Sequence, residues 1–164
     1  YAQSILSIES PGQLKKSISG AYGAFQLMPS VARAQGLTVN KTTDERKDFE
    51  KSATAAAKLI QNICIPEAKK ILSAHELEYA ENDLWFRFLV LHIYHAGAGN
   101  VAAVLNVIKP MEGSQKLIKS MWQNKAAGFG NCSQNYSQLA IASQLILHDM
   151  VYSNCDGVIS YSSR

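Results

Sequence analysis

The apolar positions along the chain recur at helical spacing, and no sustained alternation of apolar and polar residues is present. The first helical segment is expected to end near Glu9, because Pro11-Gly12 is a strong turn signal. Pro29 stands where a short helix would begin, and Gly36 is a natural stop for it. Strands that alternate with helices are missing, so a parallel sheet is not expected. The pattern predicts an all-α protein.

A longer helix is expected after Asp44, whose side chain can cap its start. Its apolar residues follow at spacings of four and three and form one stripe: Phe49, Ala53, Ala56, Ile60 and Ile63. Pro66 is expected to start another helix, because proline is tolerated in a first helical turn.

The stretch 84–94, which Asp83 can cap, is apolar on nearly all sides and is predicted to lie in the centre of a bundle. Gly97 and Gly99 interrupt it before a helix resumes over residues 101–108. A loop is expected over residues 125–131, and a last helix from about Ser133 to Tyr152. One face of that helix would carry Tyr136, Leu139, Ser143, Ile146 and Met150.

Length and composition fit a single compact domain spanning residues 1–164, of which 47% are hydrophobic and 18% charged. The formal net charge of +3 is spread out, and no basic run is long enough for a nucleic-acid patch. No apolar run approaches the roughly 18 residues of a membrane span. The chain opens like the inside of a helix, without a signal peptide. We therefore expect a fragment whose targeting signals, or a membrane or lipid anchor, lie upstream.

Three cysteines leave at least one thiol without a partner in the chain. Cys132 and Cys155 can pair in an oxidising compartment; the alternative is that both are free, as is Cys64. His92 and His95 could face one way on a helix, but two histidines do not make a metal site. We interpret His92 as a core residue and His95 as a polar residue at the edge of a cleft, and predict no metal.

The strongest functional signal begins at Glu9. Alone, this residue would be read as a solvated charge, because acidic side chains are seldom buried. After a polar loop, however, residues 17–32 read Ser-Ile-Ser-Gly-Ala-Tyr-Gly-Ala-Phe-Gln-Leu-Met-Pro-Ser-Val-Ala. With Glu9, this stretch resembles the signature of the soluble lytic transglycosylase family, which is related to goose-type lysozyme. The matching positions are Glu9, Ser10, Ser17, Gly20, Ala21, Gly23, Gln26, Met28, Pro29 and Ala32.

A second motif follows at residues 94–101, Tyr-His-Ala-Gly-Ala-Gly-Asn-Val, which is similar to the family's Tyr-Asn-Ala-Gly-x-Gly-x-Val. A third, Glu-Thr-x-x-Tyr in the family, is faint here as Cys-Ser-Gln-Asn-Tyr over residues 132–136. The likeness spans about residues 7–147. Two glycine-rich motifs in the right order are specific, whereas either alone would be weak.

The resemblance implies a lysozyme-like helical domain with a substrate cleft that cuts peptidoglycan glycan strands. The family cleaves the β-1,4 bond between N-acetylmuramic acid and N-acetylglucosamine without a cofactor. One glutamic acid, here Glu9, acts as acid and then as base. The N-acetyl group of the substrate assists, and the 6-hydroxyl closes a 1,6-anhydro ring. A periplasmic or exported location follows from this substrate.

The chemistry of Glu9 agrees with that role. Glycosidic cleavage needs a proton on the leaving oxygen, and a glutamic acid supplies it if its surroundings keep it protonated. Most glycosidases use two carboxylates, but the chain offers no strong second one. Asp44, Asp48 and Asp83 read as caps or first-turn acids, and Asp149 lies far along the last helix.

Other site residues follow from matched positions. Ser17 and Gln26 would bond the sugar near the cut, Gly23 would let the backbone approach the ligand, and Met28 would line the floor of the cleft. Each has a plain alternative: Ser17 as a turn residue, Gln26 as a solvated polar residue and Met28 as core.

Three aromatic positions complete the predicted site. Tyr94 would hydrogen-bond near Glu9 or the N-acetyl group, His95 would contact substrate, and Tyr136 matches the late family tyrosine. The alternative for both tyrosines is the core.

The chain departs from the family at four places. His95 replaces an asparagine, Ala98 a proline and Cys132 an acidic residue, and the loop after Ser10 is short and lacks the usual Phe-x-Pro. These changes bear on substrate preference and rate more than on fold. Three alternatives to the transglycosylase are a hydrolase like goose-type lysozyme, a binding module that has lost activity, and a helical interaction domain whose motifs match by chance. The co-occurrence of two ordered motifs argues against the last. The retained Glu9 argues against the binding module, and Cys132 argues mildly for it.

Overall fold

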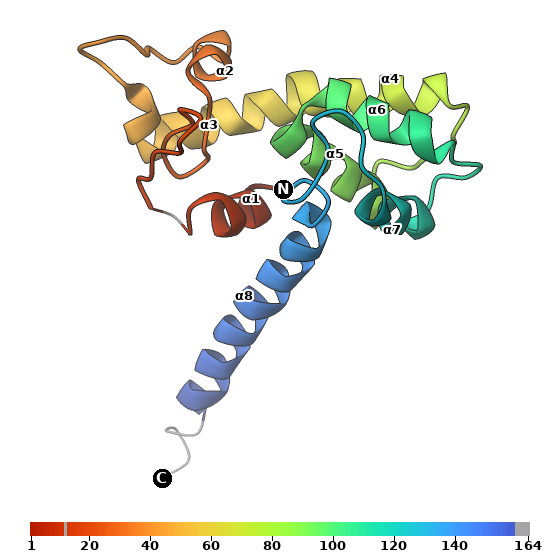
Figure 1. The fold of residues 1–164 in the computed structure, drawn as a ribbon. Coiled ribbons are helices and arrows are strands. Elements are labelled where there is room, and N and C mark those ends of the chain that lie inside the picture. Colours follow the sequence, from red (N-terminus) through yellow and green to blue (C-terminus); the bar gives the residue numbers. More distant parts are fainter. Residues whose placement is uncertain (12, 160–164) are drawn as a thin grey trace.

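Helices form most of the chain, in the order that Figure 1 shows. The computed structural model describes residues 1–11 and 13–159, with side chains to residue 153. The elements are α1 (Ala2–Glu9), α2 (Pro29–Ala34), the short 3-10 helix η1 (Glu45–Lys47), α3 (Phe49–Leu59), the π-helix η2 (Ile60–Cys64), α4 (Ile65–Ala74), α5 (Leu84–Ala96), α6 (Ala98–Ile108), α7 (Gln115–Gln123) and α8 (Tyr136–Ile159). Within these residues β structure is limited to isolated bridges, so the predicted all-α class is confirmed. None of these helices is long and apolar enough to cross a membrane.

The central helix α5 was predicted from its apolar run, and the structure confirms it. Phe86, Leu89 and Val90 are fully buried, and the helix packs against α4, α6, α7 and α8. Gly97 ends α5 with a φ of +83°, a backbone conformation that glycine adopts at no steric cost. This packing fixes the end of α5, and with it Tyr94 and His95.

One predicted helix cap was wrong. Asp44 caps η1 and not the long helix, whose first turn is capped by Asp48 through the Lys51 amide at 2.9 Å. The predicted stripe is confirmed at Ala56 and Ile60, which are buried, and is wrong at Phe49 and Ile63, which are about half exposed. Ser52 and Ala55 are buried beside it, so the buried face overlaps the predicted one only in part.

Pro66 lies in the first turn of α4, as predicted, but α4 is not separated from what precedes it, because α3, η2 and α4 form one continuous run from residue 49 to residue 74. A proline inside an α-helix lacks a donor and clashes with the preceding turn. Here the wide turn of η2 precedes it, and the Ile65 amide bonds the Ile60 carbonyl five residues back. The extra residue in this turn gives the proline ring room, so the run crosses the molecule without a break.

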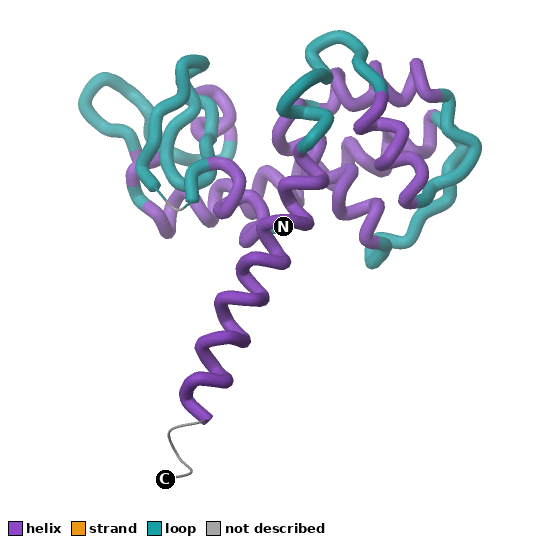
Figure 2. Tube along the Cα trace, turned by 60° about the horizontal axis from the view of Figure 1, so that its bottom comes forward, coloured by secondary structure: helices purple, strands orange, loops and turns teal. Residues whose placement is uncertain are grey.

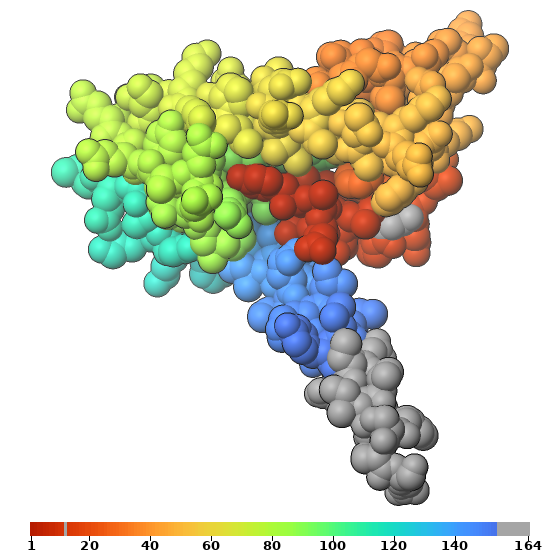
Figure 3. All heavy atoms as spheres, turned by 180° about the vertical axis from the view of Figure 1, so that it is seen from behind, coloured from red at the N-terminus to blue at the C-terminus, as the bar shows by residue number. Residues whose placement is uncertain are grey.

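The last helix differs from its predicted course. α8 packs by its first turns against α1 and α5, and then projects away from the other helices (Figures 1 and 3). Leu139, Ile146 and Met150, predicted to share an inner face with Tyr136, are 47%, 61% and 59% exposed. Tyr136 itself is buried at 1% exposure. Helix α7, over residues 115–123, was not predicted.

The elements form two groups on either side of α1 and α3. Residues 10–48 are mostly loop with α2, whereas α4 to α7 form a helical group on the other side (Figure 2). Cys64 is a buried free thiol and Cys132 an exposed one. Cys155, which could pair with Cys132, lies outside the residues whose side chains are described.

His92 on α5 is a core residue, as predicted, with no exposed surface. Within the part of the chain that the structure describes, neither ring nitrogen has a hydrogen-bond partner. Burial lowers the pKa of His92 from 6.5 to about 4; the nearby Ser133 backbone opposes that shift, and His95 adds to it. The folded protein therefore keeps a neutral imidazole over a pH range in which the unfolded chain takes up a proton.

We expect this histidine to make the fold sensitive to acid. Its contribution to stability is complete above pH 6.5 and is lost as the pH falls toward 4, by about 3 kcal/mol in total. Urea unfolding at pH 7.5 and pH 4.5 measures the loss. The variant His92→Leu, of similar volume, should show a smaller loss between the two pH values. An equal loss in both proteins would contradict the expectation.

Candidate active site

Glu9 is the last residue of α1 and is held by the residue that follows it. The Ser10 hydroxyl is 1% exposed and donates to the Ala24 carbonyl at 3.0 Å. This bond ties the end of α1 to the loop of residues 10–28, which we call the active-site loop. The side chain of Glu9 keeps 16% exposure and opens onto a cavity.

Two aromatic residues contact one oxygen of the Glu9 carboxyl group. The Tyr136 hydroxyl donates to Oε1 at 2.9 Å, and Nδ1 of His95 lies 3.4 Å from the same atom. The two rings stack, with centroids 4.4 Å apart. Burial raises the pKa of Tyr136 far above its usual range, and the charge of Glu9 adds to this, so the hydroxyl remains a donor. The carboxyl group is thus held through Oε1, and no hydrogen bond to Oε2 is found from the described residues.

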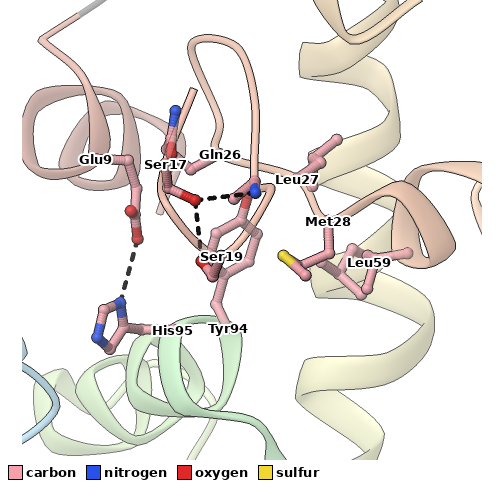
Figure 4. Close-up of a pocket in the computed structure, with 11 residues that line it drawn as sticks. Glu9, Ser17, Ser19, Gln26, Leu27, Met28, Leu59, Tyr94 and His95 are labelled. Atoms are coloured by element: carbon pink, nitrogen blue, oxygen red, sulfur yellow. Dashed lines mark hydrogen bonds and ion pairs between the residues drawn. The ribbon is translucent and has the colours of Figure 1, made fainter. Parts of the chain in front are cut away.

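The active-site loop folds back on itself through short antiparallel bridges. Tyr22 pairs with both Lys16 and Leu27. The Ser17 hydroxyl accepts from the Ala21 amide at 2.9 Å and contacts the Ser19 hydroxyl at the same distance (Figure 4). Ser17 is therefore a turn-forming residue that also faces the cavity.

Gln26 and Gly23 stabilise the conformation of this loop. Gln26 has a φ of +47°, and its amide nitrogen donates to the carbonyls of Lys15 at 2.7 Å and Gly23 at 2.9 Å. Gly23 has a φ of +85°, and a Cβ there would lie 2.2 Å from the Arg46 carbonyl oxygen. Glycine is required for this close approach of two chain segments. The predicted contacts of both residues with substrate stay predictions.

Arg46 holds the active-site loop in place by hydrogen bonds, a role that was not predicted from the sequence. Its side chain is 5% exposed and donates to the carbonyls of Gly20 and Leu27, both at 2.9 Å. Its other nitrogens pair with Asp44 at 2.7 and 2.9 Å, which lowers the pKa of that carboxyl group. The guanidinium also lies 5.6 Å from the centre of the Tyr22 ring. The sequence carries one signal for this pairing, because the side chain of an arginine two residues after an aspartate can reach that carboxylate.

Apolar and aromatic side chains close the rest of the cavity. Met28 and Leu59 line one side, and Tyr94 stands between them and His95 (Figure 4). The Tyr94 hydroxyl donates to the Phe25 carbonyl at 2.7 Å, so its proton is directed to the loop and not to Glu9. Burial raises the pKa of Tyr94 far above its usual range, with Glu9 contributing less.

The cavity measures about 310 Å³, a volume within the range of ligand pockets. Most predicted site residues line it: Glu9, Ser17, Gln26, Met28, Tyr94 and His95. Gly23 and Tyr136 are not in the lining, although Tyr136 touches Glu9. Ser19, Val31 and Leu59 were not predicted; they come from the loop and from helices that only the fold brings together. Glu9 is the single carboxylate of this lining, which suits proton transfer by one group. In the described residues no group of three potential metal ligands occurs.

A model of the transglycosylase SLT domain family matches residues 2–114 of the chain. The chain belongs to this family. The matched stretch covers more than half of the SLT protein and includes Glu9, the active-site loop and Tyr94. No curated protein and no solved structure gave a match. The family comprises lytic transglycosylases, enzymes that act on peptidoglycan, and a chance likeness of the motifs is thereby excluded.

The SLT family match ends before α7 and α8. Tyr136, the residue that donates to Glu9, therefore lies outside the matched stretch. Its hydroxyl reaches the acid from a position 127 residues further along the chain. The faint third motif had predicted this tyrosine as a site residue but not its contact with Glu9, which depends on how α8 packs.

Proposed function

We propose that this SLT protein is a lytic transglycosylase that cuts the β-1,4 bond between N-acetylmuramic acid and N-acetylglucosamine. The observation that carries the proposal is Glu9, the single carboxylate in the lining of the cavity, which accepts from Tyr136 through one oxygen and has no hydrogen bond to the other from the described residues. A protonated Oε2 supplies the proton that the glycosidic oxygen needs when its bond to carbon breaks.

The second half of the reaction regenerates the acid. The N-acetyl carbonyl oxygen of the muramic acid bonds to the anomeric carbon as the leaving sugar departs. Glu9, now a carboxylate, takes the proton of the 6-hydroxyl, whose oxygen displaces the N-acetyl oxygen and closes the 1,6-anhydro ring. No water is consumed, and Glu9 ends protonated, so one carboxylate is enough.

The remaining cavity residues would position the glycan. Ser17, Gln26 and His95 offer polar atoms along the lining, and Met28 and Tyr94 offer apolar surface for the sugar rings. The substrate implies a periplasmic or exported location, which we include in the proposal. A hydrolase of the same fold would use the same acid but would release a reducing end.

The products discriminate these functions. Purified peptidoglycan sacculi are incubated with the protein, and the released muropeptides are analysed by mass spectrometry. Products lighter by one water than the hydrolytic ones support the transglycosylase. Reducing ends would favour the hydrolase. Binding to sacculi with no released product would favour a binding module instead.

Removing the Tyr136 hydroxyl is expected to slow cleavage. In Tyr136→Phe the buried ring still stacks on His95, but Glu9 loses its closest partner. A hydrogen bond to a charged group contributes about 1.5–3 kcal/mol, so turnover should fall by roughly 10- to 100-fold. The rate of muropeptide release measures this, and circular dichroism checks the fold. Unchanged turnover would remove Tyr136 from the site.

A further inference from the structure

The contact of Tyr136 with Glu9 depends on where α8 begins. The first turns of this helix pack against α1 and α5, whereas its later turns project away from the other helices (Figure 1). An α-helix rises about 1.5 Å per residue. A displacement of α8 by one such step, away from or past Glu9, would lengthen the 2.9 Å hydrogen bond beyond the usual range of about 2.5–3.0 Å. The contact therefore requires that the first turn of α8 be fixed.

Gln134, two residues before Tyr136, joins the start of α8 to the end of α7. Its side-chain nitrogen donates to the carbonyls of Trp122 at 2.8 Å and Asn124 at 3.0 Å. Its side-chain oxygen accepts from the Asn131 backbone amide at 2.9 Å. The residue is 9% exposed. One buried side chain thus bonds three points of the backbone that leads from α7 to α8.

A second contact runs beside these bonds. Nε1 of Trp122 donates to the side-chain oxygen of Asn135 at 2.9 Å. We call Trp122, Gln134 and Asn135 the α8 clamp. The last carbonyls of a helix have no partner within that helix, so the end of α7 offers acceptors to the clamp. The clamp ends directly before Tyr136, so it fixes the residue that carries the hydroxyl.

We propose that Gln134 is a positioning residue for the reaction: through the α8 clamp it holds Tyr136 where the hydroxyl meets Glu9. The inference rests on the proposed function of Glu9 as the acid. Gln134 is not among the described residues that line the cavity, so it acts through Tyr136 and not on the glycan. The proposal gives a part in the reaction to α7, which begins at residue 115, just past the end of the SLT family match.

The test variant is Gln134→Met, which keeps a side chain of similar length and removes its donors and its acceptor. The matched control is Gln123→Met, the same change at the exposed last residue of α7. Circular dichroism and thermal unfolding establish that both variants fold. If Gln134→Met does not fold, Trp122→Phe takes its place, because it removes one bond of the clamp at a residue that is 45% exposed.

The first experiment is a double-mutant cycle with Tyr136→Phe, read as turnover in muropeptide release. We expect Gln134→Met alone to slow turnover by at least about fivefold and at most by the effect of Tyr136→Phe, roughly 100-fold. Added to Tyr136→Phe, it should slow turnover by less than about twofold more, because both changes remove the same hydrogen bond.

Two controls accompany this cycle. Binding of sacculi should be kept in Gln134→Met, and Gln123→Met should have the turnover of the parent. Unchanged turnover in Gln134→Met would overturn the proposal. Equal slowing by this change with and without the Tyr136 hydroxyl would overturn it too, because Gln134 would then act on the fold alone. The same comparison decides the matter for Trp122→Phe where that variant is used.

A second experiment needs no catalytic activity. Crystal structures of the parent, Gln134→Met and Gln123→Met are compared at the Tyr136 hydroxyl. We expect its distance from Oε1 of Glu9 to exceed about 3.5 Å in Gln134→Met alone, and an unchanged distance would overturn the proposal. A lengthened distance, with no muropeptide released by the parent, would overturn the proposed function, while the placement of Tyr136 by Gln134 would stand.

Discussion

Replacing Glu9 with glutamine is expected to reduce the rate of glycan cleavage at least about 1000-fold, because the amide cannot deliver or take up a proton. Glutamine has nearly the same shape as glutamic acid and can still accept from Tyr136 through its carbonyl oxygen. The fold should therefore be kept, and the loss should appear in turnover and not in the binding of sacculi.

The control for this change is Glu50→Gln, on an exposed position of α3 away from the cavity. It makes the same chemical substitution and should leave the release of muropeptides unchanged. Equal rates for the parent and Glu9→Gln would show that another group supplies the proton. Weaker binding of sacculi by Glu9→Gln, with turnover per bound molecule preserved, would show that Glu9 acts in binding.

Replacing Arg46 with methionine is expected to destabilise the fold by about 1.5–3 kcal/mol, the usual contribution of hydrogen bonds made by a charged group, because Asp44, whose side chain is 22% exposed, would lose its charged partner. The carbonyls of Gly20 and Leu27 would lose their donor as well. Both carbonyls belong to the active-site loop, so cleavage should fall even at temperatures where the helices remain folded. Thermal unfolding and muropeptide release measure the two effects.

Arg33→Met is the matched control. Arg33 is exposed on α2 and makes one side-chain bond, to the Val39 carbonyl at 3.1 Å. Exposed interactions of this kind contribute at most about 1 kcal/mol. A similar loss of stability in both variants would contradict the anchoring role of Arg46. A stable Arg46→Met protein with full activity would do so too.

The sequence predicts most of the site because much of it is local. Gly23, Gln26 and Met28 fall within one short loop, where spacing alone brings side chains together. The end of α5 could also be predicted, because Gly97 stops the helix just after Tyr94 and His95. These residues needed no knowledge of how distant segments pack.

What the sequence did not predict depends on packing between segments. The role of Arg46 depends on its hydrogen bonds to the carbonyls of Gly20 and Leu27, and only the folded structure brings these residues to it. The wide turn before Pro66 packs against α5, a contact between distant segments that the local sequence does not reveal. The start of α8 is buried and its later turns are not, and periodicity alone cannot distinguish the two.

The contact between Glu9 and Tyr136 can form only late during synthesis of the chain. A chain synthesised from its N-terminus carries its acid from the start, but the hydroxyl that holds that acid emerges 127 residues later. Domains generally fold as units during synthesis, so a nascent chain that has not reached α8 contains the loop motif without a completed active site. A truncation just after residue 114 would keep the whole family match and still lack the tyrosine. The proposed site is therefore complete only once α8 has packed against α1.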